Sequence, residues 1–168
     1  MKRLLILFSF VGIISGCILE KEHKSSDIQT GDPLPAFKVV MNDGTVITDD
    51  DLKKGVSIVM FFHTSCPDCQ QALPRVQAIY DEYAPKGLGF ALISREESSS
   101  DIGDYWKNNS LNMPYSAQSD RKVYNKFASS RIPRIYISDE NGIVRYIFTD
   151  DPVPSYDELK SAVESLIR

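Results

Sequence analysis

Two cysteines separated by two residues are the clearest chemical feature of this sequence. Cys66 and Cys69 lie in the segment TSCPDC, residues 64–69, where a predicted strand passes into a predicted helix. The first sulfur of such a pair lies at the helix N-terminus, where unpaired amides and the helix dipole stabilise a thiolate. That thiolate can attack a disulfide, and the second thiol, one turn further on, can resolve the mixed disulfide. Pro67 suits the first helical position because it has no amide hydrogen to leave unpaired.

The same cysteine pair has two other interpretations. A static disulfide between Cys66 and Cys69 would close a very small loop and would stabilise the fold little. A structural zinc site usually has four protein ligands, and the chain has no second Cys-x-x-Cys pair. His63 lies at the end of the preceding strand, so a three-ligand metal site of Cys66, Cys69 and His63 stays open. Redox chemistry is the interpretation that the order of elements favours.

A buried strand and an amphipathic helix are expected to hold the cysteines. The run VSIVMFF, residues 56–62, is continuous and rich in β-branched and aromatic side chains, as expected of a central strand. From Pro67 to about Ala84, apolar side chains recur at spacings of three and four, which predicts a helix. The run LGFALIS, residues 88–94, predicts a second buried strand.

The remaining elements predict one α/β domain. An Asp-Gly turn predicts a hairpin over residues 37–48, and an Asn-Gly turn predicts another over residues 134–148. Helices are expected over residues 101–109 and 120–128, and a last one follows a capping box at the C-terminus. We therefore expect a mixed central sheet, with a parallel core and an antiparallel edge, flanked by helices on both faces and preceded by an N-terminal β-hairpin.

The composition indicates a globular domain and excludes some classes of partner. The chain has 168 residues, of which 42% are hydrophobic, and a net charge of −4. This is enough apolar material for a core. The acidic balance argues against non-specific nucleic-acid binding, which depends on Lys and Arg. Three cysteines cannot all pair with one another, so Cys17 needs a separate role.

The N-terminus resembles a bacterial lipoprotein signal. Lys2 and Arg3 precede 11 uncharged residues, 4–14, a stretch too short for a transmembrane helix, which needs about 20. The segment ISGC, residues 14–17, resembles the lipobox, in which cleavage precedes a cysteine that carries lipid. Cys17 is therefore the expected lipidation site.

This interpretation divides the chain into three parts. We expect a signal peptide at residues 1–16, a lipid-anchored flexible tether at residues 17–31 and one domain at residues 32–168. Acyl chains on a cysteine anchor a protein firmly to a membrane. The expected location is the bacterial cell envelope, with the domain facing the periplasm or the exterior.

The domain carries motifs of a known fold family. They are GDPLPAF at residues 31–37, VMFFHTSCPDC at residues 59–69, Pro74 five residues after the second cysteine, and Ile132-Pro133 before a predicted strand. Together they resemble the thioredoxin fold, and specifically the membrane-tethered, extracytoplasmic TlpA/ResA-like thiol–disulfide oxidoreductases. The resemblance extends from about Asp32 to the end of the chain.

The resemblance implies a role for each matching residue. Cys66 would be the nucleophile and Cys69 the resolving thiol, with Pro67 and Asp68 completing the active-site motif. Pro74 would kink the active-site helix. The Ile132-Pro133 bond would be cis, with its backbone facing the disulfide and pairing with substrate.

The resemblance also implies a reaction and partners. The redox-active Cys66–Cys69 disulfide would be sufficient without a bound cofactor or metal. Protein thiols and disulfides would be the substrates, in a reducing role, and a membrane thiol carrier would supply electrons. Nucleic acid is not an expected partner.

Three positions depart from the family pattern. Met60 replaces the buried aspartate of thioredoxins proper, and Ser65 replaces the tryptophan before the first cysteine. Ala72 stands where many TlpA/ResA-like relatives carry glutamate. The two carboxylates that usually move the Cys69 proton are thus absent, and the sequence names no replacement.

Two other functions remain as alternatives. A peroxiredoxin-like peroxidase shares the entry motif of residues 31–37 but needs a threonine three residues before its reactive cysteine, whereas Thr64 is two before Cys66. A Cu(I) or other metal-binding chaperone would use Cys66, Cys69 and His63.

Overall fold

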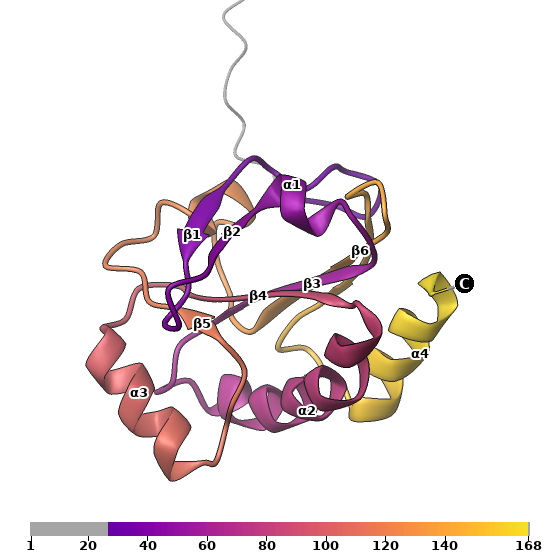
Figure 1. Ribbon diagram of the computed structural model, residues 1–168. Helices are drawn as coiled ribbons and strands as arrows, with labels where there is room; N and C mark the ends of the chain where they lie inside the picture. Colours follow the sequence, from indigo (N-terminus) through magenta and orange to yellow (C-terminus); the bar gives the residue numbers. More distant parts are fainter. Residues whose placement is uncertain (1–26, 168) are drawn as a thin grey trace, which may run out of the picture.

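A five-stranded sheet forms the centre of the computed structural model, which describes residues 27–167 (Figure 1). The strand order is β5-β4-β3-β6-β7, and β3, Ser57–Phe62, lies in the middle. All six residues of β3 are buried. A strand covered on both faces needs a nearly continuous apolar sequence rather than an alternating one, and this confirms the central position predicted for it.

Parallel strands form one half of the sheet. Strand β4, Gly89–Ser94, runs parallel to β3, and β5, Tyr115–Ser116, runs parallel to β4. Helix α3, Ser99–Asn108, lies between β4 and β5 in the chain and begins after Ser98, whose side chain accepts a hydrogen bond from the Asp101 amide. Because β3 and β4 are parallel, their C-terminal ends lie at the same edge of the sheet.

An antiparallel hairpin forms the other half. Strand β6, Arg134–Ser138, pairs with β3 on one side and with β7, Val144–Phe148, on the other. The turn between them is held by the Asp139 carboxylate, which accepts hydrogen bonds from the Asn141 and Ile143 amides at 2.9 and 3.0 Å. Gly142 has φ +72°, a conformation that glycine adopts without strain. The hairpin predicted here is confirmed.

Different elements cover the two faces of the sheet: long helices lie on one face, and the N-terminal hairpin with a short helix lies on the other (Figure 1). Helix α2, Pro67–Tyr83, followed by the 3-10 turn η1, Ala84–Lys86, packs beside α4, Tyr156–Leu166, on one face. The capping box predicted for α4 is present, because Ser155 and Glu158 exchange side chain to backbone hydrogen bonds.

The N-terminal hairpin covers the opposite face. It consists of β1, Lys38–Val40, and β2, Val46–Thr48, which pair antiparallel. The short helix α1, Asp49–Leu52, follows directly, with Thr48 as its N-cap. The mixed sheet with helices on both faces and an N-terminal hairpin is therefore the observed fold.

The helix predicted over residues 120–128 is wrong. Only the 3-10 turn η2, Tyr124–Lys126, forms there. The Asp120 carboxylate accepts a hydrogen bond from the Lys122 amide at 2.9 Å, a local turn that competes with helix formation. Two buried aromatic residues three positions apart, Tyr124 and Phe127, fit a single tight turn as well as a helix.

Residues 27–31, which the sequence assigns to the tether, lie against the domain. The Ile28 amide donates to the Phe127 carbonyl and the Gly31 amide to the Val144 carbonyl, both at 2.8 Å. The predicted signal peptide of residues 1–16 and Cys17 lie outside the described residues. Within residues 27–167, no helix has the length and apolar character needed to cross a membrane.

Candidate active site

Cys66 lies at the start of α2, at the edge where β3 ends. It is the N-cap residue, with φ −83° and ψ 119°, and Pro67 is the first helical residue. The Cys66 carbonyl accepts the first helical hydrogen bond, from the Gln70 amide at 2.9 Å. No side chain caps this helix end, so its first amide groups have no side-chain acceptor and favour negative charge beside Cys66.

Cys69 lies one turn further along α2 and is inaccessible to solvent. Burial raises the pKa of the Cys69 thiol well above its ordinary value, and a hydrogen bond with the His63 backbone offsets this only in part. Cys66 and the negative charge of Asp68 raise the pKa of Cys69 further. The half-buried Cys66 sulfur is therefore the accessible one, and Cys69 stays protonated behind it.

The loop before β6 closes over Cys66. The Ile132–Pro133 peptide bond is cis, in agreement with the family resemblance, and the Cys66 thiol donates to the Ile132 carbonyl with a sulfur–oxygen distance of 3.6 Å. Arg131, directly before, has φ +70°, and its carbonyl accepts a hydrogen bond from the Tyr124 hydroxyl at 2.6 Å. Buried Tyr124 thus holds the backbone that faces the Cys66 thiol.

Asp68 and Pro74 are the two other α2 residues that the sequence singled out. Asp68 is half-buried in the first turn, where an acidic side chain is favourable to the helix dipole. Its carboxylate accepts a hydrogen bond from Gln71 Nε2 at 3.4 Å, on the exposed side of the helix. Pro74 lies inside α2, which nevertheless continues to Tyr83. The proline is therefore accommodated within α2 and does not end it.

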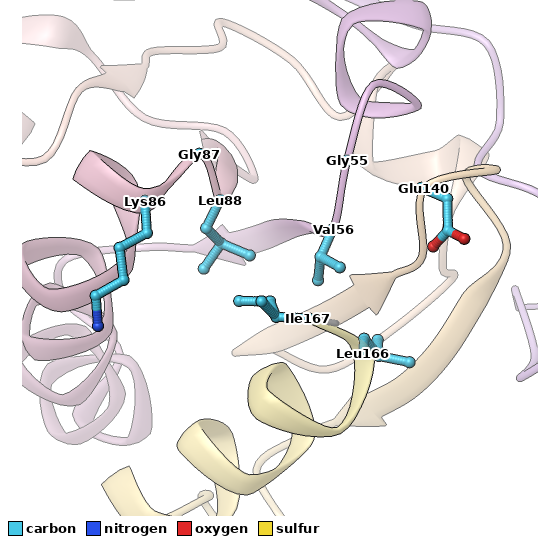
Figure 2. A pocket seen from close by; sticks show the side chains of 8 residues that line it. All are labelled: Gly55, Val56, Lys86, Gly87, Leu88, Glu140, Leu166 and Ile167. Carbon is cyan, nitrogen blue, oxygen red and sulfur yellow. The ribbon is translucent and has the colours of Figure 1, made fainter.

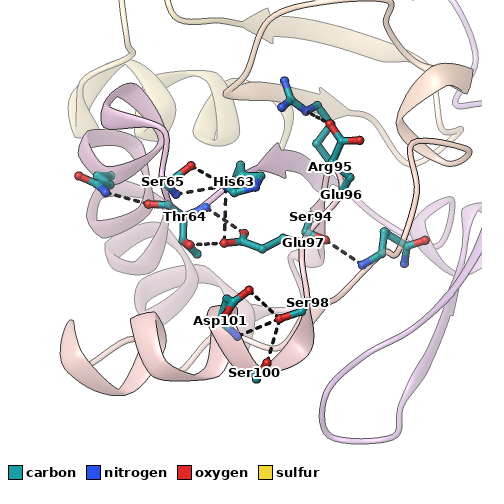
Figure 3. Close-up of polar contacts among 12 residues, drawn as sticks. His63, Thr64, Ser65, Ser94, Arg95, Glu96, Glu97, Ser98, Ser100 and Asp101 are labelled. Carbon is teal, nitrogen blue, oxygen red and sulfur yellow. Dashed lines mark hydrogen bonds and ion pairs between the residues drawn. The ribbon is translucent and has the colours of Figure 1, made fainter.

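A buried carboxylate that the sequence did not single out lies beside the cysteine loop (Figure 3). Glu97, on the segment between β4 and α3, has a side chain only 4% exposed. Its carboxylate accepts hydrogen bonds from the Thr64 amide, at 2.9 Å, and from the Thr64 hydroxyl. The Thr64 carbonyl in turn accepts a bond from Gln70 Nε2 at 2.8 Å. The turn that leads into Cys66 is therefore fixed from both sides.

The profile of the AhpC/TSA family matches residues 30–147, well over half of the chain. The chain belongs to the AhpC/TSA family. Thiol-disulfide oxidoreductase ResA of Bacillus cereus is 28% identical over 144 residues, covering 84% of this chain and 80% of that protein. ResA of Bacillus subtilis (strain 168) is 26% identical over 123 residues, covering 73% and 68%.

Solved structures show the fold of this AhpC/TSA family member. The thioredoxin-family thiol:disulfide interchange protein of Chlorobium tepidum TLS superposes with a TM-score of 0.69 at 23% identity, over 84% of this chain and 99% of that one. StoA of Bacillus subtilis gives a TM-score of 0.66 at 21% identity, over 79% and 98%. The fold is thioredoxin-like, and the chain is a thiol–disulfide oxidoreductase of the TlpA/ResA-like kind.

Two of the three departures from the family pattern are buried apolar residues in this AhpC/TSA protein, whereas Ser65 is exposed. Met60 and Ala72 are both inaccessible to solvent, so neither position holds a group that could move a proton. The buried Glu97 carboxylate lies elsewhere, against Thr64 in the turn that precedes Cys66. The sequence could have indicated Glu97, because a residue that follows β4 reaches the same edge of the sheet as a residue that follows the parallel strand β3.

The alternative functions are not favoured. Within residues 27–167, no group of three or more His, Cys, Asp or Glu side chains is placed to hold a metal ion, so Cys66, Cys69 and His63 do not form the three-ligand site left open by the sequence. The AhpC/TSA relatives compared above carry the name thiol–disulfide oxidoreductase rather than peroxidase.

A cavity of about 270 Å³ lies at the other end of the sheet (Figure 2). Val56 and Leu88, which line it, precede the first residues of β3 and β4, whereas Cys66 follows the last residue of β3. Leu166 and Ile167 close the cavity from the end of α4. It is therefore separate from the cysteine pair.

Proposed function

We propose that this oxidoreductase reduces disulfide bonds of extracytoplasmic proteins, with Cys66 as the nucleophile and Cys69 as the resolving thiol. One observation carries the proposal: a half-buried Cys66 thiol at an uncapped helix start faces the Ile132 carbonyl, with Cys69 buried behind it. This arrangement exposes the Cys66 sulfur to a substrate and leaves the Cys69 thiol available to resolve the mixed disulfide.

The reaction divides into two exchanges. The Cys66 thiolate attacks one sulfur of the substrate disulfide, that disulfide breaks, and the other substrate sulfur leaves as a thiolate. Cys69 then loses its proton to water and attacks the Cys66 sulfur, forming the Cys66–Cys69 disulfide and releasing the second substrate thiolate. Two electrons pass to the substrate, and the oxidised enzyme must be reduced again by a thiol donor.

The loop of Ile132 and Pro133 supports a peptide substrate. Pro133 has no amide hydrogen, so the backbone beside Cys66 offers the Ile132 carbonyl as an acceptor. In the free enzyme the Cys66 thiol donates to this carbonyl. An extended peptide that supplies a backbone amide would take the place of that bond and release the thiol for attack.

We extend the proposal to the location of the enzyme. The segment at residues 14–17 supports lipidation at Cys17, which would hold the domain at a membrane through a short tether. A membrane thiol carrier would then be within reach as the electron donor, and neither a metal nor a bound cofactor is needed for exchange. Labelled palmitate should enter the full chain and should be lost in Cys17→Ala.

The activity is tested by reduction of insulin in the presence of dithiothreitol. The purified protein should accelerate precipitation of the insulin chains, and Cys66→Ser should abolish the acceleration. Turnover of hydrogen peroxide at a comparable rate would instead support the peroxidase. The direction of electron flow is tested by the reduction potential, which we expect nearer the value of about −270 mV typical of thioredoxin than about −120 mV, the value of a strong oxidant.

A further inference from the structure

His63, the last residue before the cysteine turn, has three polar neighbours at one ring nitrogen (Figure 3). Its Nδ1 lies 3.2 Å from the Ser65 amide nitrogen and 2.9 Å from the Ser65 hydroxyl. The same atom lies 3.6 Å from Glu97 Oε1. The side chain is 26% exposed, so protons can reach it from solvent.

These neighbours cannot all bond to Nδ1 in one protonation state. The Ser65 amide is a donor and requires an unprotonated Nδ1, whereas the Glu97 carboxylate is an acceptor and requires a protonated one. The Ser65 hydroxyl can serve either state by rotating. Neutral His63 with its proton on Nε2 therefore accepts from the Ser65 amide, and doubly protonated His63 donates from Nδ1 to Glu97.

Glu97 is held in place for this exchange. Both of its carboxylate oxygens accept hydrogen bonds from Thr64, so the carboxylate cannot turn away when His63 is neutral. The other charged groups nearby have partners or lie elsewhere: Arg95 and Glu96 pair with each other at 3.3 Å, and Asp68 is on the first turn of α2. The Glu97 carboxylate is consequently the charged partner of protonated His63.

The contact reaches the nucleophile through the backbone. Ser65 directly precedes Cys66, and the Cys66 amide donates to the His63 carbonyl at 3.1 Å. A change at His63 Nδ1 thus alters the hydrogen bonds of the residue next to the reactive thiol, while the added charge acts on the thiolate through space.

We propose that His63 is a positioning residue for Cys66, which holds Ser65 when neutral and, once protonated against Glu97, sustains the Cys66 thiolate at mildly acidic pH. The proposal deepens the proposed function, because it concerns the regulation of the same site, and it rests on that function for its biological meaning. The resulting device makes thiol exchange respond to pH where histidine side chains titrate, between about pH 5 and 8.

The test uses two substitutions that separate the roles. In His63→Asn, the side-chain oxygen is bonded to Cγ, as Nδ1 is in histidine. It can therefore accept a hydrogen bond from Ser65 but cannot become positively charged. His63→Ala removes both the acceptor and the charge. Alkylation of the reduced full chain by iodoacetamide, with the Cys66 adduct quantified by peptide mass spectrometry from about pH 5 to 8, the range in which histidine titrates, measures thiolate reactivity without any substrate.

Two results are expected. Near the acidic end of this range the natural protein should alkylate at Cys66 about twice as fast as His63→Asn, because a unit charge within about a nanometre changes an equilibrium by roughly that factor in water-like screening. At the alkaline end, exchange of the protein with Ellman's reagent should be about fivefold slower in His63→Ala than in His63→Asn, the effect of one ordinary hydrogen bond.

Coincident alkylation profiles for the natural protein and His63→Asn would overturn the pH response. Equal exchange rates for His63→Ala and His63→Asn at the alkaline end would overturn the positioning role. Either failure would leave insulin reduction intact, whereas loss of insulin reduction in the natural protein with the expected alkylation profiles would overturn the proposed function and not this inference.

Discussion

Replacing Glu97 by alanine is expected to destabilise the fold and loosen the turn that leads into Cys66. The carboxylate accepts two hydrogen bonds from Thr64, one from its amide and one from its hydroxyl. Thr64 is only 8% exposed, so water cannot freely replace the lost acceptor. Hydrogen bonds to charged groups contribute about 1.5–3 kcal/mol each, and we expect a total loss of roughly 2–4 kcal/mol because relaxation lets some water enter.

The neighbouring residue supplies a matched control for this substitution. Glu96 has a side chain 41% exposed, and its ion pairs with Arg95 and Arg121 span 3.3 and 3.9 Å at the surface. Glu96→Ala removes the same charge one position away and should change the free energy of unfolding by less than about 1 kcal/mol. Both variants keep the cysteine pair and its helix.

Urea unfolding of the two variants, followed by tryptophan fluorescence, measures the difference directly. The reasoning predicts a clearly lower midpoint for Glu97→Ala than for Glu96→Ala, with similar slopes for both. Equal midpoints would refute it, because they would mean that the buried carboxylate contributes no more than a surface one. Glu97→Gln should fall between them, since its amide oxygen can accept from the Thr64 amide and its NH₂ group can donate to the Thr64 hydroxyl, but neither bond then involves a charged group.

Three further predictions concern other parts of the molecule. Burial opposes ionisation of Asp139, but hydrogen bonds from backbone amides and Arg145 outweigh it and hold the pKa of Asp139 below its ordinary value. The ionised carboxylate therefore stabilises the fold above about pH 4, and this contribution is lost as the pH falls. Asp139→Asn should reduce the loss of stability at acidic pH, measured by urea unfolding as a function of pH. Asp68→Asn should lower the pKa of Cys69, because the Asp68 charge adds to the effect of burial there; an unchanged pH dependence of the rate at which Cys69 resolves a mixed disulfide at Cys66 would contradict this. Ser155→Ala removes the N-cap side chain of α4 and should lower the free energy of unfolding in urea by about 1 kcal/mol. An unchanged free energy of unfolding would show that the cap does not stabilise the helix.

The elements with local signals could be predicted from the sequence. The run of residues 56–62 is apolar almost throughout, and a strand in the middle of a covered sheet accommodates such a run. The turn at residues 139–142 and the capping box at Ser155 are also encoded within a few residues. From these features the central strand, the hairpin and the last helix could be predicted.

Elements that depend on distant contacts were missed or misassigned. Strand β5 is only two residues long and exists because it pairs with β4, which no local pattern indicates. The segment at residues 120–128 has helical spacing, yet Tyr124 forms its hydroxyl bond with Arg131, and a short turn achieves this. Tertiary packing therefore overrode the periodicity there.

The candidate site was predictable in its sulfur chemistry and not in its support. Cys66 and Cys69 follow from their spacing after a strand, whereas Glu97 is 28 residues beyond Cys69 in the chain and reaches the turn only because β3 and β4 run parallel. At the two positions where relatives usually carry a carboxylate, this chain has the apolar residues Met60 and Ala72. Both are buried, and because neither has a polar side chain, no unpaired polar group is left in the core.

The central claim is that Cys66 meets the substrate and Cys69 releases it, and trapping the intermediate tests this most directly. Cys69→Ser, reacted with a protein disulfide and analysed by peptide mass spectrometry without reduction, should accumulate a mixed disulfide at Cys66. Cys66→Ser, treated in the same way, should accumulate almost none, because the remaining thiol is buried. A stable adduct at Cys69 in Cys66→Ser, or none at Cys66 in Cys69→Ser, would contradict the account.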